Sequence, residues 1–183
     1  TGTLGGDVYH EWGLTDRTTL VFSGSQTQGA APRLGLDIAR DIWPGRDWRY
    51  GWSIGAGLQD GDPALRAGAS MGRGVTVMGQ SGWILGQLST TATLDLIETK
   101  AEATLGVTLP TGWKVWSQIS VTDSMANVFV PTLTPAVPPP GDIRAGVSAA
   151  VPVRDGLWVN LGVSHGLTAS GSTKIKLGLW AEF

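Results

Sequence analysis

Apolar and polar residues alternate along most of this 183-residue chain. In residues 174–183 every odd-numbered position is apolar, ending on Phe183, whereas the even-numbered positions hold lysine, glycine, tryptophan and glutamate. A period of two residues is typical of a β-strand whose two faces meet different surroundings. This stretch therefore predicts a strand with one purely apolar face and one charged, small or amphipathic face.

The same alternation predicts ten further strands, and no segment has a convincing helical pattern. Residues 72–81 form a glycine-punctuated connection in this interpretation, and residues 91–97 are ambiguous. Residues 123–141 form the one long loop, which is rich in proline. The chain is predicted to be a single all-β domain of about eleven visible strands, at residues 7–13, 18–26, 33–43, 48–59, 64–71, 82–90, 98–109, 113–122, 142–153, 157–165 and 174–183.

The composition narrows the class of protein. Charged residues make up 15% of the chain, against roughly 25% in typical soluble domains, and the mean hydropathy is +0.06. No run approaches the roughly 18 apolar residues of a membrane-spanning helix, which excludes a helical membrane protein. Cysteine is absent, which excludes disulfides and cysteine-ligated metals, and a net charge of −2 without a basic patch excludes nucleic acid as a partner.

Two segments carry a resemblance to a known class. A last strand that ends on an aromatic residue resembles the closing strand of bacterial outer-membrane β-barrels. Residues 11–20, Glu-Trp-Gly-Leu-Thr-Asp-Arg-Thr-Thr-Leu, resemble a hairpin that recurs in small proteobacterial, porin-like outer-membrane proteins. The resemblance is close in this hairpin and extends to the rest of the chain only as a pattern. It implies an antiparallel up-and-down transmembrane β-barrel in the Gram-negative outer membrane, in contact with lipid and lipopolysaccharide.

The strand count has a consequence if the resemblance holds. Bacterial outer-membrane barrels have an even number of strands, and their two termini lie in the periplasm. Eleven visible strands then predict a twelve-stranded barrel whose first strand is absent from this sequence. The alternative is that residues 72–97 are misinterpreted and that ten or twelve strands lie within the chain. An ordinary soluble β-barrel or sandwich with half-buried strands is the other interpretation of the pattern.

The tryptophans favour the membrane interpretation. All nine lie near the predicted periplasmic turns or the C-terminal end. Five aromatic residues are expected to face lipid there and to form one girdle at the interface, where an indole N–H stays hydrated: Trp12, Trp48, Trp52, Trp113 and Phe183. A soluble sandwich gives no reason for such a one-ended distribution.

The opposite face of the predicted strands is rich in glycine and carries charges of both signs. The predicted lumen-lining residues are Arg49, Arg66, Glu98, Lys100, Glu102, Arg144, Lys174 and Lys176. They fit a narrow polar channel, and equally a lumen closed by ion pairs such as Lys100 with Glu98 or Glu102. The whole inward face also includes Arg33, Asp37, Asp41 and Glu182, so its charges of the two signs nearly balance, and strong ion selectivity is not expected. Four tryptophans are expected to point inward: Trp43, Trp116, Trp158 and Trp180. In one interpretation they form a stacking platform or a constriction, and in the other they fill the narrow end of the barrel.

Three functions follow in order of preference. The first is a porin-like outer-membrane channel for small polar solutes. The second is a non-conducting barrel that anchors or scaffolds an envelope or surface-export complex through a protein partner. The third is a lipid-modifying enzyme, which needs a hydroxyl nucleophile beside a base; the only histidines are His10 and His165, and Ser164 faces away from His165. We therefore expect no enzymatic activity, catalytic residue, cofactor or metal.

Overall fold

The computed structural model describes residues 3–27, 29–42, 47–126, 141–168 and 171–181. No helix in this part of the chain is long and apolar enough to cross a membrane. The regular structure consists of eleven strands: β1 (Thr3–Thr15), β2 (Thr18–Thr27), β3 (Arg33–Asp41), β4 (Arg49–Gln59), β5 (Asp62–Val77), β6 (Gln80–Ala92), β7 (Leu96–Thr108), β8 (Lys114–Ala126), β9 (Asp142–Arg154), β10 (Leu157–Gly166) and β11 (Thr173–Ala181).

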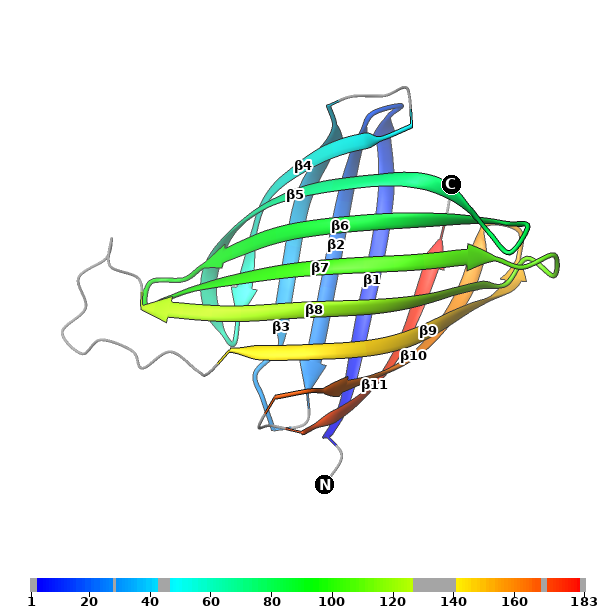
Figure 1. Ribbon diagram of the computed structural model, residues 1–183. Helices are drawn as coiled ribbons and strands as arrows, with labels where there is room; N and C mark the ends of the chain where they lie inside the picture. The colour runs from blue at the N-terminus through cyan, green and yellow to red at the C-terminus, as the bar shows by residue number, and fades with distance from the viewer. Residues whose placement is uncertain (1–2, 28, 43–46, 127–140, 169–170, 182–183) are drawn as a thin grey trace.

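The strands form one strongly curled sheet in which each strand is antiparallel to its neighbours in sequence (Figure 1). Each of these antiparallel pairs is joined by at least eight residue pairs. The predictions of an all-β class, up-and-down order and eleven visible strands are confirmed. The alternative of ten or twelve strands is wrong for the described residues.

The two edges of the sheet meet in a different way. Strand β1 pairs with β11 in parallel, and among the described residues this pairing consists of Thr3 with Lys174 and Leu4 with Ile175. An odd number of alternating strands leaves the first and last strands pointing in the same direction, so an antiparallel contact is impossible here. The ring of strands is therefore joined by a short parallel contact, which we call the seam.

The structure corrects the interpretation of residues 72–81 as a connection. Strand β5 continues to Val77, and a two-residue turn at Met78 and Gly79 leads directly into β6. Both turn residues have positive φ angles, 51° and 80°, as a type I′ hairpin requires. The alternation was hidden here because Gly72 and Gly74 contribute no side chain to either face. In the ambiguous region 91–97, residues 91–92 end β6, residues 93–95 form the connection, and residues 96–97 begin β7.

The distribution of side chains is inverted relative to a compact soluble domain. Leu65, Ile54 and Leu177 are 70%, 58% and 61% exposed, together with most large apolar side chains on the convex face. Among the described residues, the buried apolar ones are only Val21, Ala64 and Ala150. In the described part of the chain no second layer covers either face of the sheet, so the concave face borders a lumen and the convex face is open to the surroundings (Figure 1).

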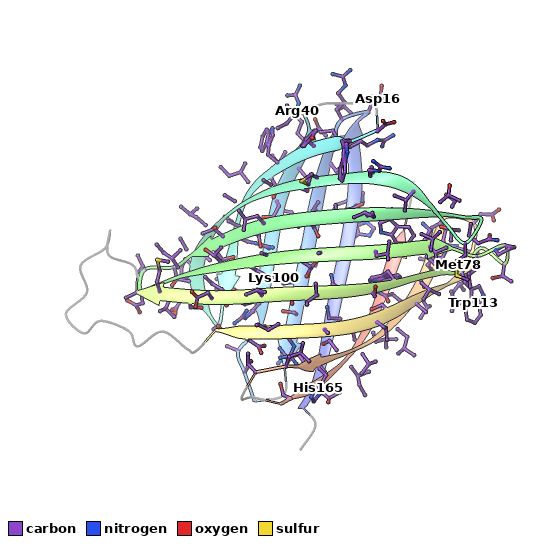
Figure 2. All side chains as sticks on the ribbon, viewed as in Figure 1. Asp16, Arg40, Met78, Lys100, Trp113 and His165 are labelled. Atoms are coloured by element: carbon purple, nitrogen blue, oxygen red, sulfur yellow. The ribbon has the colours of Figure 1, made fainter. Side chains whose placement is uncertain are left out.

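The two ends of the curled sheet differ in their connections. Figure 2 places Met78 and Trp113 at one end, which we call the Trp113 end, and His165 at the other, the His165 end. The turns β1–β2, β5–β6, β7–β8 and β9–β10 lie at the Trp113 end. The connections β2–β3, β4–β5, β6–β7 and β10–β11 lie at the His165 end. Most of the predicted long loop 123–141, residues 127–140, is outside the described residues.

Candidate functional site: the polar lumen

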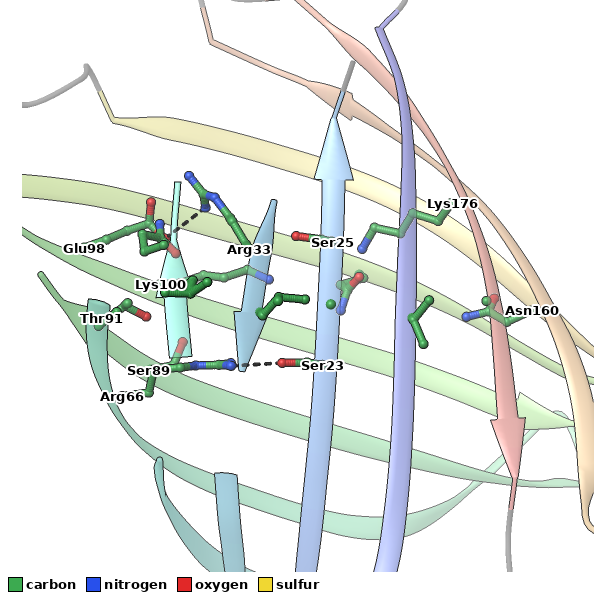
Figure 3. A pocket seen from close by; sticks show the side chains of 18 of the residues that line it. Ser23, Ser25, Arg33, Arg66, Ser89, Thr91, Glu98, Lys100, Asn160 and Lys176 are labelled. Atoms are coloured by element: carbon green, nitrogen blue, oxygen red, sulfur yellow. Dashed lines mark hydrogen bonds and ion pairs between the residues drawn. The ribbon is translucent and has the colours of Figure 1, made fainter. Parts of the chain in front are cut away.

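The lumen contains two neighbouring cavities with volumes of about 620 and 510 Å³. The first includes Ser23, Arg66 and Trp116 in its wall, and the second includes Arg144 and Lys174 at the His165 end. Six residues line both cavities, and we call them the shared ring: Ser25, Arg33, Glu98, Lys100, Gln118 and Lys176. The ring brings polar side chains from several strands together where the two cavities adjoin (Figure 3).

An arginine bridges the lumen at the shared ring. Arg33 on β3 lies 3.5 Å from Glu98 on β7, although three strands separate β3 and β7 in the sheet. The same guanidinium is 3.0 Å from Asp60, in the turn between β4 and β5. The side chains of Arg33 and Asp60 are 43% and 49% exposed, so each pair is worth at most about 1 kcal/mol. The bridge therefore limits the width of the lumen more than it stabilises the fold.

A second bridge lies deeper in the first cavity. Arg66 on β5 donates a 2.9 Å hydrogen bond to Ser23 Oγ on β2 and lies 3.2 Å from Asp37 on β3. The guanidinium occupies the space that a side chain at Gly35 would fill. Glycine at this position is thus required for the close approach of Arg66 to the opposite wall.

The wall formed by β9 to β11 holds a third polar cluster, at the His165 end. Arg144 lies 2.8 Å from Asp142 and donates hydrogen bonds to Ser172, at 2.7 Å to its carbonyl oxygen. Asp142 also accepts a 2.9 Å hydrogen bond from Thr168. These contacts attach the β10–β11 connection to the start of β9.

Seven of the eight predicted lumen-lining residues line the lumen cavities, and Arg49 does not. Lys100 pairs with Glu102 on its own strand, as one of the predicted alternatives required. Arg66, Glu98, Lys100, Glu102, Arg144, Lys174 and Lys176 line one or both lumen cavities. Arg49 lies apart from them, in a hollow of about 580 Å³ near the Trp113 end with Asp41 and Asp47.

Aromatic rings line the lumen near the Trp113 end. The ring centroids of Trp83 and Trp116 are 6.5 Å apart, and the Lys114 ammonium lies 4.3 Å from the centroid of the Trp158 ring. Strands β6 to β10 supply these four residues, Trp83, Lys114, Trp116 and Trp158, which we call the aromatic arc. Of the other predicted inward tryptophans, Trp43 and the side chain of Trp180 lie outside the described residues.

Trp83 is the tryptophan of the arc that sequence reasoning did not place in the lumen, and Lys114 was not among the predicted site residues either. Trp83 interrupts the alternation of its strand because it is a large apolar residue at an inward position. Its ring lies over Gly106 on β7, where any side chain would collide with it. The signal that could have placed Trp83 is its pairing with Gly106, which leaves room for the ring. The sequence alone does not give this pairing, because it depends on the register between β6 and β7.

The predicted girdle residues lie toward the Trp113 end. Trp12, Trp52 and Trp113 are exposed, at 45%, 39% and 43%. Trp48 is half-buried, with the guanidinium carbon of Arg73 5.4 Å from its ring centroid. Phe183 lies outside the described residues.

The two histidines lie in different surroundings. His165 Nδ1 shares a 2.9 Å hydrogen bond with Thr173 Oγ1 at an exposed position, and Ser164 on the other face lines the second cavity. No acidic side chain among the described residues is hydrogen-bonded to His165, so a base oriented by a third group is absent there. His10 packs edge-on against Trp12, with centroids 4.2 Å apart.

Metal binding has no support in the described part of the chain, where no group of three His, Cys, Asp or Glu residues is placed to hold an ion. The chain matches no family model, and no curated protein or solved structure is significantly similar to it.

Proposed function

We propose that this protein is a small outer-membrane β-barrel that passively conducts small polar solutes through its lumen. The observation that carries the proposal is the exposed apolar convex face, which extends around the sheet and includes Ile38, Ile54, Leu88, Val121 and Leu177. Soluble monomers rarely expose contiguous apolar patches of more than a few hundred Å². Contact with lipid would remove this surface from water, at about 25 cal/mol per Å².

The tryptophans support the orientation of this barrel. Trp12, Trp52 and Trp113 are exposed on different parts of the sheet but lie toward the same end. Indole rings favour the boundary between hydrocarbon and water because one edge is apolar and the N–H needs a polar partner. We propose that the Trp113 end lies at the periplasmic interface and the His165 end faces outward.

The lumen supports conduction. Its two cavities share the six residues of the ring, and both are lined by hydroxyl, amide and charged side chains. Such a wall replaces part of the hydration shell of a polar solute and holds water in the lumen. A soluble binding barrel with the same lumen would instead need a hydrated convex face.

A non-conducting barrel that anchors or scaffolds an envelope complex is the second candidate. Its support is the pair of bridges across the lumen, from Arg33 to Glu98 and from Arg66 to Ser23. An ion pair and a hydrogen bond that cross the lumen hold it closed if they do not open during passage.

The seam supports a twelfth strand. Two residue pairs join β1 and β11 where the structure describes these edges, so most of the described backbone groups that face each other there form no ladder. Within hydrocarbon, each unsatisfied backbone N–H or C=O costs several kcal/mol. One additional strand between β1 and β11 would be antiparallel to both and would give the even strand number of this class.

A disulfide test measures the seam directly in the protein expressed from its full reading frame. Continuing the observed register opposes Gly6 to Leu177. The chain has no cysteine, so the double variant Gly6→Cys and Leu177→Cys reports on this pair alone. Adjacent strands lie about 4.8 Å apart, whereas an inserted strand doubles the separation and exceeds the ~7 Å limit for a disulfide. Efficient oxidation in the membrane would refute a twelfth strand.

Single-channel recording in a planar bilayer tests the proposed conduction. Purified protein should give discrete conductance steps, and Gln118→Trp should reduce them because residue 118 belongs to the shared ring. The matched control is Val121→Trp, which adds the same bulk to the same strand on the exposed convex face. Absence of steps from folded, heat-modifiable protein would overturn conduction and favour the non-conducting barrel.

A further inference from the structure

Positive and negative residues are nearly equal in number over the whole lumen, but they are unevenly distributed along it. The shared ring contains three cationic side chains, Arg33, Lys100 and Lys176, and one anionic side chain, Glu98. Its formal charge is therefore +2. The sequence predicted weak selectivity because it counts charges over the whole lumen, whereas the ring is the part that both cavities share.

The three cationic side chains of the ring differ in whether an acidic side chain pairs with them. Asp60 and Glu98 both pair with Arg33, and Glu102 pairs with Lys100. Lys176 makes no ion pair within 4 Å with any acidic side chain that the structure describes. Its register on β11 is fixed by pairing with Gly162 on β10, which has no side chain that could cover it. Figure 3 shows Lys176 extending from β11 into the space that contains Ser25 and Arg33.

The surroundings of Lys176 favour an anion. Ser25 and Gln118 belong to the same ring and offer a hydroxyl and an amide as hydrogen-bond donors. Glu98, the acidic member of the ring, is already bound by Arg33, at 3.5 Å. A small anion near Lys176 would therefore meet one uncompensated positive charge and neutral donors.

We infer that the shared ring is an anion-selecting site, with Lys176 as its specificity-determining residue. The solutes it favours are small hydrated anions, either inorganic ions such as chloride and phosphate or short-chain carboxylates. This inference rests on the proposed channel function and names the solute class of that same lumen. Lys176 contributes its positive charge to the site, and Ser25 and Gln118 orient the bound anion with their hydrogen-bond donors.

The test is the ratio of chloride to potassium permeability, measured from reversal potentials under a KCl gradient. The ratio should exceed one in the unmodified protein. A unit charge about 6 Å from an ion in water-like surroundings changes its local concentration roughly threefold. Because the lysine charge enriches chloride and depletes potassium by this factor each, Lys176→Gln should lower the ratio about tenfold, and Lys176→Glu should lower it about a hundredfold, to below one.

The control is Arg154→Gln, which removes one positive charge at the exposed end of β9, outside both lumen cavities. It should leave the permeability ratio unchanged within about 1.5-fold, because salt screens an exposed charge beyond about 10 Å. Equal ratios in the unmodified protein and both Lys176 variants would overturn the inference while leaving the channel function intact.

A second measurement decides the anion site if the bilayer recordings are silent, an outcome that overturns conduction. Calorimetric titration of the folded protein in detergent with inorganic phosphate should give a saturable heat. The inference predicts that Lys176→Gln abolishes this heat and that Arg154→Gln preserves it. The absence of saturable heat in the unmodified protein, or its persistence in Lys176→Gln, would overturn the anion site itself.

Discussion

An arginine on the convex face distinguishes a lipid-facing sheet from a water-facing one. Ile54 is the best position because it is the central residue of β4 and is 58% exposed. In water, Ile54→Arg would change the stability of a folded domain by about 0.5 kcal/mol or less, as exposed substitutions usually do. At the midplane of a bilayer, the same arginine costs about 2–4 kcal/mol. This difference corresponds to a factor of roughly 30 to 1,000 in the folding equilibrium.

The structure also sets how the cost should vary with depth. Leu58 lies four residues from Ile54 on the same face of β4, toward the His165 end. A rise of about 3.3 Å per residue and a tilt of about 40° place it about 10 Å farther from the midplane. Leu58→Arg should therefore cost about 1 kcal/mol or less. The lumen-facing control Gln118→Arg should be nearly neutral in both environments.

The assay is reversible urea unfolding in lipid vesicles, followed by tryptophan fluorescence. Its readout is the free energy of unfolding of each variant relative to the unmodified protein. A cost for Ile54→Arg below about 0.5 kcal/mol would refute the lipid-facing assignment. Equal costs for Ile54→Arg and Leu58→Arg would refute the depth argument even if both variants were destabilised.

Three further substitutions test other parts of the structure. Gly106→Val should displace the Trp83 ring that lies over it and lower the free energy of unfolding by about 1–3 kcal/mol through overpacking. Urea unfolding measures this loss, and near-ultraviolet circular dichroism reports on the Trp83 ring. Glu98→Gln should break the ion pair to Arg33 across the lumen, raising single-channel conductance while changing stability by less than about 1 kcal/mol. Met78→Asn should stabilise the protein by up to about 1 kcal/mol, because Met78 has a φ angle of 51° that asparagine tolerates better; thermal unfolding measures it.

Each of these substitutions has a control or a contrary outcome. Gly74→Val is the control for Gly106→Val, because the nearest atom to a side chain at Gly74 is 3.9 Å away; equal losses would contradict the role of the Trp83 contact. Unchanged conductance in Glu98→Gln would show that the bridge does not limit passage. Asparagine at the exposed Met71, which has no positive φ, should not stabilise the protein, and equal gains at Met71 and Met78 would contradict the turn argument.

Period-two alternation sufficed to predict the strands because each side chain in a strand points to a fixed face. It failed where glycines removed the signal, at Gly72 and Gly74, and where Trp83 placed an apolar ring on the inward face. In both places the pairing of neighbouring strands, rather than the local sequence, determines which residues belong to the ladder.

The sequence by itself determined the class of fold, the up-and-down order and the tryptophan-rich end, because these follow from local alternation and from short turns between strands. Only the tertiary structure decided which side chains meet inside the lumen. Arg33 and Glu98 are 65 residues apart in sequence, and their contact depends on the curvature that brings β3 opposite β7. Curvature arises from the sum of the twists and registers of all the strands, so no local pattern encodes it. The same curvature brings Arg33, Lys100 and Lys176 together in one ring. This local excess of positive charge cannot be seen from the nearly equal numbers of positive and negative residues along the chain.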